Sequence, residues 1–369
     1  MDLSSVPILD HHCHSLLREP PARLEPFFTE GADPSHVPQT VFFRWAIREL
    51  AGFFDCPATI EAVQAARAAL AWPELSARML RDANVAALLI DLGYRTGQSL
   101  GLDEARRDLP CRVEPILRLE TLAQDLVLRH DTLGQVLDAY VAGVEAARRD
   151  GYVALKSIVA YRTGLSIGEP SRADVSVAFA GASERARRDG RVRLAEPALN
   201  DRLVRLALEG AARLELPFQI HTGFGDADVD LLRANPLLLR PLLEDRRYSP
   251  VPFVLLHAGY PYVRELAYLA ALYPNVYMDL SLAIPFAAGD VVSVVSQALG
   301  LAPTSKLLYA SDAFSIPDLF WIAARWGRRA IARVLGDLVD QGALDRDEAL
   351  DAARRILHDN AARLYLDGV

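Results

Sequence analysis

Eight short apolar runs alternate with longer amphipathic stretches along this chain of 369 residues, and this alternation restricts the possible folds more than any other feature. Several runs are almost continuously apolar, which is typical of parallel strands buried on both faces. The stretches between them repeat apolar residues every three or four positions, as amphipathic helices do. The predicted strands are Val6–His14, Val85–Leu92, Val113–Glu120, Val153–Ala160, Pro217–His221, Pro252–His257, Val276–Asp279 and Leu307–Ser311. Eight such strands with intervening helices predict an α/β fold, the (β/α)₈ TIM barrel.

The segment between the first two predicted strands, residues 16–82, is too long for an ordinary connection. It is rich in proline at its start and then helical over Thr40–Gly52, Thr59–Ala71 and Pro73–Asp82. Because it follows the first strand, we expect a helical insertion that caps one face of the barrel. Residues 345–364 predict a closing helix. No linker or internal repeat divides the sequence, so we expect a single domain over residues 1–369.

The charge balance argues against a nucleic-acid partner, because 48 acidic and 40 basic residues give a net charge of −8. No apolar run reaches the ~18 residues of a membrane span, and residues 1–14 lack the pattern of a signal peptide. Cys13, Cys56 and Cys111 lie far apart without a C-x-x-C pair, which argues against disulfides or a thiolate zinc site. We expect a cytoplasmic protein with a small-molecule substrate and no membrane partner; a homo-oligomer is compatible with the sequence.

Histidine and aspartate stand directly after several apolar runs. His221 follows the fifth predicted strand, His257 the sixth and Asp312 the eighth, and the first strand ends in a His-x-His pair, His12 and His14. Side chains alternate along a strand, so the imidazoles of His12 and His14 share one face. The carboxyl ends of the strands carry the chemistry of such barrels. Imidazole and carboxylate groups gathered there predict a site for one or two divalent metal ions.

The same alternation predicts that His11 and Cys13 point away from this site, with His11 facing the helix layer. Asp10 shares the inward face but lies one layer deeper, so we expect it to support the metal ligands rather than to bind the ion.

Lys156 lies within the apolar fourth predicted strand. A lone buried ammonium group is costly, and lysine responds by losing its proton. A neutral amine can add carbon dioxide to become a carbamate, an anionic ligand able to bridge two metal ions. A buried ion pair is the alternative for Lys156.

Four further side chains are candidates for substrate binding. Tyr161 and Arg162 follow the fourth predicted strand, and Arg118 and Glu120 stand at the end of the third. Arginine suits a substrate carboxylate because it forms bidentate hydrogen bonds. A salt bridge to the cap is an equally good reading of these arginines.

The ligand pattern resembles that of the amidohydrolase superfamily, in particular the amidohydrolase-2 group. That pattern has His-x-His after strand one, lysine or glutamate after strand four, histidine after strands five and six, and aspartate after strand eight. Longer segments resemble the amidohydrolase domain of FluG-like proteins. These segments are Val6–His12, Leu155–Leu165 and Ser311–Pro317.

The resemblance implies a metal-dependent hydrolase that cleaves an amide C–N bond of a small carboxylate-bearing substrate with metal-activated hydroxide. It implies a divalent ion, with zinc favoured, held by His12, His14 and Asp312. A carboxylated Lys156 would bridge to a second ion at His221 and His257. Asp312, with His257 and Lys156, would act in catalysis, and Asp312 would pass a proton to the leaving amine.

Two other readings stay open. A mononuclear-metal decarboxylase or hydratase of the amidohydrolase-2 group would use the same histidines without a bridging lysine. A barrel that binds a small ligand without converting it is the third possibility, although metal ligands without a function would be a burial cost.

Overall fold

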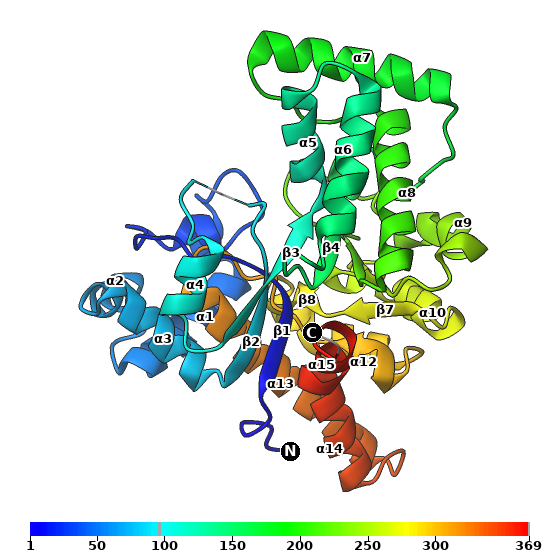
Figure 1. Ribbon diagram of the computed structural model, residues 1–369. Coiled ribbons are helices and arrows are strands. Elements are labelled where there is room, and N and C mark those ends of the chain that lie inside the picture. Colours follow the sequence, from blue (N-terminus) through cyan, green and yellow to red (C-terminus); the bar gives the residue numbers. More distant parts are fainter. Residues whose placement is uncertain (95–96, 368–369) are drawn as a thin grey trace.

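The apolar runs form one parallel sheet that curls into a barrel (Figure 1). The computed structural model describes residues 1–94 and 97–367. The strands pair in the order β1-β2-β3-β4-β5-β6-β7-β9, and every pair is parallel. Their bounds are β1 Ile8–His14, β2 Val85–Asp91, β3 Arg112–Arg118, β4 Ala154–Ser157, β5 Phe218–Ile220, β6 Phe253–Leu255, β7 Val276–Asp279 and β9 Leu307–Leu308, with a short β8 at Ser281–Leu282. The predicted TIM barrel is confirmed.

The barrel closes between β9 and β1 through the chain that follows β9. The backbone N–H of Asp312 donates to the carbonyl oxygen of His12 at 3.0 Å, and the N–H of His14 donates to that of Ala313 at 2.8 Å. The carboxylate of Asp10 accepts hydrogen bonds from the N–H of Ser311, at 3.0 Å, and from its hydroxyl. Asp312 is therefore fixed beside the His-x-His pair.

Most strands end earlier than the apolar runs suggest. The predicted strand Val113–Glu120 ends at Arg118, and α5 (Leu119–Arg129) begins at the next residue. Glu120 therefore lies in the first turn of a helix rather than on a strand. Its Oε1 accepts hydrogen bonds from the Ser157 hydroxyl at 2.7 Å and from the N–H of Ile158 at 2.9 Å, which holds this turn against the end of β4.

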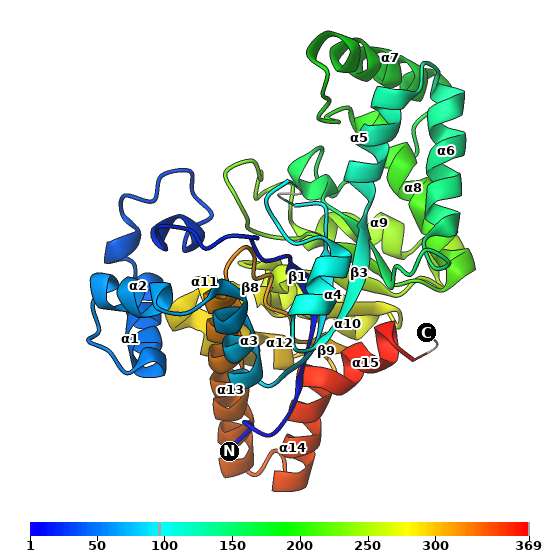
Figure 2. The ribbon, with the colours of Figure 1, turned by 60° about the vertical axis from the view of Figure 1, so that its left-hand side comes forward.

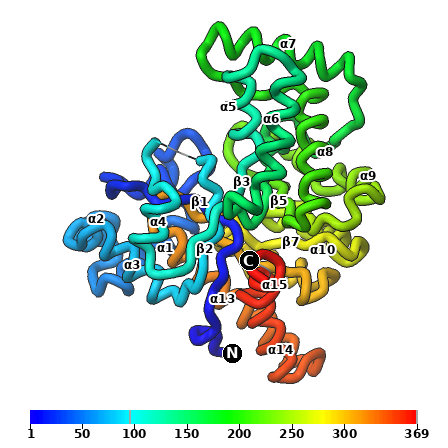
Figure 3. The backbone as a smooth tube through the Cα atoms, in the orientation of Figure 1, coloured from blue at the N-terminus to red at the C-terminus, as the bar shows by residue number. Residues whose placement is uncertain are grey.

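Helices surround the strands of the barrel (Figure 2). Two groups of helices and the C-terminal helices are described below. The remaining α-helices are α4 Leu102–Asp108, α9 Arg240–Leu243, α10 Val263–Leu272, α11 Ala283–Phe286, α12 Val291–Leu299 and α13 Pro317–Asp340. The predicted closing helix is α14 (Arg346–Arg354), a π-helical turn and α15 (Asn360–Tyr365). Asn360 Nδ2 donates to the carbonyl oxygen of Leu307 at 2.9 Å. The first strand and the last helix of the chain, β1 and α15, lie side by side here (Figure 3).

The insertion after β1 is helical, with α1 Val41–Phe54, α2 Ile60–Ala68 and α3 Trp72–Asp82. These helices pack along the side of the barrel against α13. Arg67 of α2 forms a buried bidentate pair with Asp318 of α13, at 2.8 and 2.7 Å, and the rings of Trp45 and Trp326 stack with centroids 4.1 Å apart. The helices of the insertion thus form a flank on α13, whereas the irregular segment before α1 reaches the barrel mouth, where Pro26, Thr29 and Glu30 line a cavity.

A second helical excursion was not recognised in the sequence. Helices α5, α6 (Leu133–Ala146), α7 (Arg172–Asp189) and α8 (Pro197–Leu214) project well beyond the barrel in both ribbon views (Figures 1 and 2). A Cβ added to Gly210 of α8 would lie 2.5 Å from Cγ1 of Val144, so a residue without a side chain lets α6 and α8 approach. None of the helices in the described chain is both long and apolar enough to cross a membrane.

Candidate metal centre and active site

A bulge in β1 sets the orientation of the histidine-rich segment. Asp10 is in register with Leu88 of β2, whereas Cys13 is in register with Ile90, so three steps along β1 match two along β2. The extra residue breaks the strict alternation of side chains. His11 consequently lies inside the barrel, where its Nε2 is 3.2 Å from Oδ2 of Asp279 on β7. The prediction that His11 faces the helix layer is wrong for this reason.

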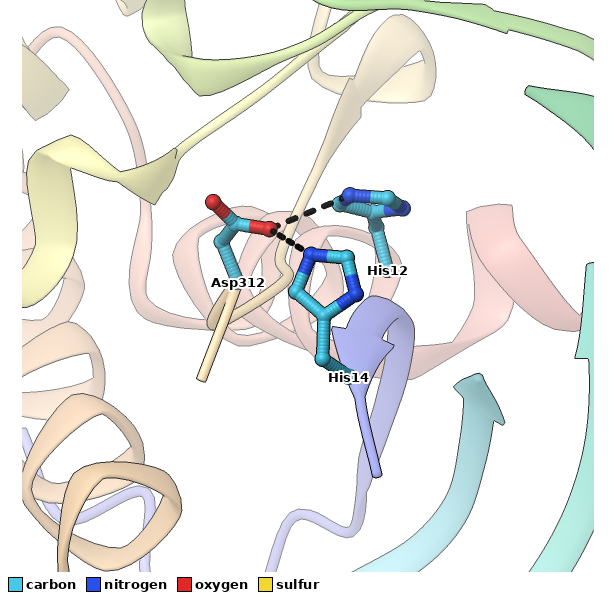
Figure 4. Close-up of side chains that lie close together, drawn as sticks. All are labelled: His12, His14 and Asp312. Carbon is cyan, nitrogen blue, oxygen red and sulfur yellow. Dashed lines mark ion pairs between the residues drawn. The ribbon is translucent and has the colours of Figure 1, made fainter. Parts of the chain in front are cut away.

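His12, His14 and Asp312 bring one ligand atom each to a common point, with all three atoms within 4.8 Å of one another (Figure 4). Nε2 of His12 lies 3.1 Å, and Nε2 of His14 3.3 Å, from Oδ1 of Asp312. The two imidazoles come from the carboxyl end of β1, and the carboxylate comes from the chain beyond β9. Asp312 has a φ of +53°, a costly conformation that tends to occur where function requires it.

These three side chains fit a divalent cation. Oδ1 of Asp312 is buried, and its approach to the two imidazoles lacks hydrogen-bond geometry, so it has no hydrogen-bond partner among the described residues. Leaving a buried charged oxygen without such a partner is costly. A cation between the carboxylate and the two ring nitrogens would satisfy all three groups, and nitrogen with oxygen donors is a set that zinc and related ions accept.

His221 and His257 stand next to this group. Their rings have centroids 4.3 Å apart, and the ring of His257 is 5.7 Å from that of His12. Burial lowers the pKa of both imidazoles, so they are held in the neutral form that binds metals. Nε2 of His221 is buried and has no hydrogen-bond partner within the described part of the chain. This nitrogen is therefore another candidate metal ligand at the carboxyl end of the barrel.

Lys156 reaches the same group from β4. Its Nζ lies 3.0 Å from Nε2 of His12, and the side chain is buried. Burial lowers the pKa of the amine to about 8, although the charges of Asp312 and Asp91 oppose that shift. Conversely, burial and the charge of Lys156 lower the pKa of His12 to about 4. The amine thus lies beside a candidate metal ligand, and part of it is uncharged near neutral pH.

Hydrogen bonds on the far sides of the rings orient these histidines. Nδ1 of His14 is 3.1 Å from the carbonyl oxygen of Asp91, and Nδ1 of His257 is 2.9 Å from the hydroxyl of Ser281. Partners of this kind fix the tautomer and orientation of metal-binding imidazoles. The backbone N–H of His257 donates to Oδ1 of Asp279 at 2.6 Å and holds the main chain at this position.

A cavity of about 390 Å³ opens over the centre. Its lining includes Lys156, His221, His257 and Asp312, together with three of the four candidates for substrate binding: Tyr161, Arg162 and Arg118. The volume suits a small-molecule ligand.

The four candidates differ in their contacts. The ring of Tyr161 is 4.3 Å from that of His221, and Nε of Arg162 is buried without a partner among the described residues. Arg118 is already bound to the buried carboxylate of Asp91, at 2.8 Å from Nε and 2.7 Å from Nη2. Glu120 is not brought into this cavity, because its carboxylate is bonded at the end of β4 and faces a separate small pocket.

Sequence reasoning missed Glu30, which lines the same cavity from the insertion. Burial, followed by the negative charges of Asp312 and Asp226, raises the pKa of its carboxyl group to about 8. The residue lies in an irregular segment without periodicity, and no motif marks it. Its place depends on how the insertion folds back over the barrel mouth, and no local pattern of residues indicates that.

The barrel and the histidine–aspartate group at its carboxyl end define a metal-dependent enzyme of the amidohydrolase superfamily. A family model described as amidohydrolase, Amidohydro_2, matches residues 183–366, and the chain belongs to this family. Protein fluG of Emericella nidulans is 32% identical over an alignment of 397 positions, which covers 97% of this chain and 45% of fluG. The chain therefore spans less than half the length of this curated relative.

Solved structures share the fold. A predicted metal-dependent hydrolase from Lactobacillus casei is 29% identical, with a TM-score of 0.90 over 99% of this chain and 98% of that one. The uronate isomerase of Thermotoga maritima is 14% identical, with a TM-score of 0.66 over 98% of this chain and 95% of the isomerase. The second likeness shows the fold alone.

Proposed function

We propose that this enzyme hydrolyses a C–N bond in a small molecule that carries a carboxylate, with the aid of a bound divalent metal ion. The observation that carries the proposal is the convergence of His12, His14 and Asp312, in which Oδ1 of Asp312 is buried between two imidazoles without a hydrogen bond. The similarity to a predicted metal-dependent hydrolase at 29% identity supports the same class of reaction.

The metal would be held by His12, His14 and Asp312, and zinc is the ion that we favour. When bound, such an ion lowers the pKa of a coordinated water toward neutrality and polarises a carbonyl oxygen. The neutral amine of Lys156 can form a bond to the carbon of carbon dioxide and release one proton, which yields a carbamate. The carbamate oxygens would then serve as ligands for a second ion, together with His221 and His257.

The chain's own groups handle the proton and the substrate. The Asp312 carboxylate accepts a proton from the attacking water and delivers it to the leaving amine, as a general base and then a general acid. Nδ1 of His257 lies 3.7 Å from Oδ2 of Asp312, so this neutral imidazole stands beside the carboxylate that carries the proton. Arg162, whose Nε is unsatisfied among the described residues, binds the substrate carboxylate beside Tyr161.

Metal analysis, intact mass and an amide assay test this proposal together. We expect at least one divalent ion per chain, a carbon dioxide adduct on one lysine, and cleavage of at least one amide in a panel of amides of small dicarboxylic acids. A chelator should abolish cleavage, and zinc, manganese or iron(II) should restore it. A protein without bound metal, or without cleavage of any panel amide when loaded, would contradict the proposal.

Ligand variants provide the control. His12→Ala, His221→Ala and Asp312→Ala should each lower the metal content, whereas His36→Ala, an exposed histidine outside the cavity, should not. If all three ligand variants keep the full metal content, the roles assigned here are wrong.

A one-metal lyase, a decarboxylase or hydratase, is the second candidate. The compact group of potential metal ligands favours this candidate. Among the described residues, that group contains His12, His14 and Asp312 but neither His221 nor His257. In that reaction His257 would act as the acid or base and Lys156 would remain an amine. One metal ion per chain together with an unmodified lysine would select this candidate.

A further inference from the structure

The insertion contributes an acidic side chain to the cavity over the metal centre. Glu30 lies in the irregular segment before α1, where Thr29 Oγ1 accepts a hydrogen bond from the N–H of Gly31 at 2.9 Å and fixes the turn around it. The side chain is partly buried, and within residues 1–94 and 97–367 its carboxylate takes part in no hydrogen bond or ion pair. Glu30 is therefore an acidic group for which the described part of the fold supplies no partner.

The electrostatic surroundings of Glu30 are unfavourable for an isolated carboxylate. Burial raises the pKa of its carboxyl group to about 8, and the negative charges of Asp312 and Asp226 add to that effect. A divalent ion at Asp312 would cancel one of these charges and return Glu30 toward its ionised form. The partly buried carboxylate would then still lack a counter-charge of its own.

Arg162 lines the same cavity and, like Glu30, forms no ion pair among the described residues. Burial and the positive charges of Arg193 and Arg118 lower the pKa of its guanidinium, and its Nε has no partner in the described structure. By contrast, Arg118 is paired with Asp91, and Arg193 with Asp228 at 2.8 Å. Glu30 and Arg162 thus line one cavity without an ion pair among the described residues, whereas the neighbouring Arg118 and Arg193 are each paired with a carboxylate.

We propose that Glu30 binds a cationic ammonium group of the substrate while Arg162 binds its carboxylate, so that the substrate is a zwitterionic amino-acid derivative. The assignment rests on the proposed function for the role of Arg162, and it deepens that function by adding the second charged group of the substrate. An ammonium group supplies the counter-charge that Glu30 lacks. A second carboxylate at this position would instead add to the repulsion from Asp312 and Asp226.

Binding measurements without turnover test the inference. The metal-loaded protein is titrated by calorimetry with L-glutamate, L-glutamine and L-alanine, and with glutarate, glutaramate and propionate, which lack only the ammonium group. We expect at least one amino acid to bind about 10-fold or more tightly than its deaminated counterpart, as a charge-assisted hydrogen bond allows. Glu30→Gln, which keeps the shape but removes the charge, should reduce this preference to less than about 2-fold.

Matched variants keep the result interpretable. Glu19→Gln, at an exposed glutamate of the same insertion outside the cavity, should leave the preference unchanged. Glu30→Asp, which retains the charge, should preserve part of the preference if Glu30→Gln proves unstable. The proposal is overturned if no amino acid is preferred by the parent protein, or if the preference survives in Glu30→Gln.

The amide assay separates this inference from the proposed function. A Glu30-dependent preference for ammonium in a protein that cleaves no amide would retain the inference and reject the hydrolase. Cleavage of amides with equal efficiency whether or not they carry an ammonium group would retain the hydrolase and reject the role of Glu30.

Discussion

The side-chain oxygen of Gln219 lies 2.8 Å from Nδ1 of His12 and determines which nitrogen of that ring faces the candidate metal centre. The amide nitrogen of Gln219 donates to the carbonyl oxygen of His11 at 2.9 Å and to the hydroxyl of Tyr365 at 3.0 Å. Because the amide nitrogen is occupied in this way, the oxygen must face His12 and accept a hydrogen bond from Nδ1–H. Nε2 of His12 is then left with a lone pair directed toward Asp312 and Lys156.

Gln219→Ala should therefore weaken metal binding. Removing a group that orients a metal-binding imidazole commonly lowers metal affinity by about 10–100-fold, and we expect a loss in that range. Gln297→Ala is the matched control, because the side chain of Gln297 bonds to Ser293 on α12 and to no other side chain among the described residues. Titration against a competing chelator measures the effect, and equal affinities in the two variants would show that Gln219 does not position His12.

Lys156→Ala should remove most of the activity of a two-metal hydrolase. The loss of a group that bridges metal ions or transfers protons costs about 100-fold or more in rate, and added acetate or formate with metal should restore part of it. Lys306 is the other lysine of the chain and donates to the carbonyl oxygens of Ala270 and Tyr273. Lys306→Ala should lower stability but not activity. Near-normal turnover in Lys156→Ala would instead indicate the one-metal lyase.

The ion pair between Asp91 and Arg118 should make the stability of the metal-free protein dependent on pH. Burial alone would raise the pKa of Asp91, but the charges of Arg118, His14 and Lys156 together lower it below its usual value. A carboxyl group whose pKa is lower in the folded state stabilises the fold above its unfolded pKa, and this contribution is lost as the pH falls through the folded pKa. Wild-type stability should accordingly decline below about pH 4.

Asp91→Asn leaves Arg118 buried without its partner, so we expect the free energy of unfolding to fall by about 3–5 kcal/mol at pH 7. The difference from the wild type should narrow as the pH is lowered below about 4. Asp131→Asn serves as control, because Asp131 is largely exposed and lies 3.6 Å from its partner Arg187; it should change stability by no more than about 0.5 kcal/mol. Chemical denaturation at several pH values checks both variants, and a constant difference between Asp91→Asn and the wild type would contradict the linkage.

The barrel and most of the candidate metal centre could be predicted from the sequence, because both depend on local patterns of apolar and polar residues. A continuous apolar run predicts a buried parallel strand, and the polar residue that directly follows the run lies at the carboxyl end of the barrel. His221, His257 and Asp312 were located in this way. The ends of the strands were less accessible, and Glu120 was placed on a strand because its run of apolar neighbours continues into the first turn of α5.

The errors arise where tertiary contacts override the local pattern. The alternation rule failed at His11, because one extra residue in β1 turns His11 and His12 inward together. Glu30 could not be recognised, since its segment has no periodicity and its place in the cavity depends on the tertiary packing of the insertion. The projection formed by α5, α6, α7 and α8 likewise depends on contacts between helices, such as the approach of Gly210 to Val144. The sequence of one helix alone does not reveal such contacts.

Gly223 tests how closely the loops that carry His221 and His257 must pack. It has a φ of +73°, and a Cβ built on it would lie 2.5 Å from the carbonyl carbon of Gly259 and 2.5 Å from the oxygen of Tyr260. These two residues follow His257, so Gly223→Ala must push the two histidine-bearing loops apart as well as strain the backbone. We expect the free energy of unfolding to fall by about 1–3 kcal/mol, together with weaker metal binding.

Gly134→Ala is the matched comparison for Gly223, because Gly134 lies in the first turn of α6 and an added Cβ would meet no atom within 4 Å. Alanine favours helix over glycine, so this variant should be as stable as the wild type or more stable by up to about 1 kcal/mol. Chemical denaturation and metal titration of both variants measure the contrast. Equal stability and equal metal affinity in Gly223→Ala would mean that the two loops have room to separate, and that the spacing of His221 and His257 is not set by this contact.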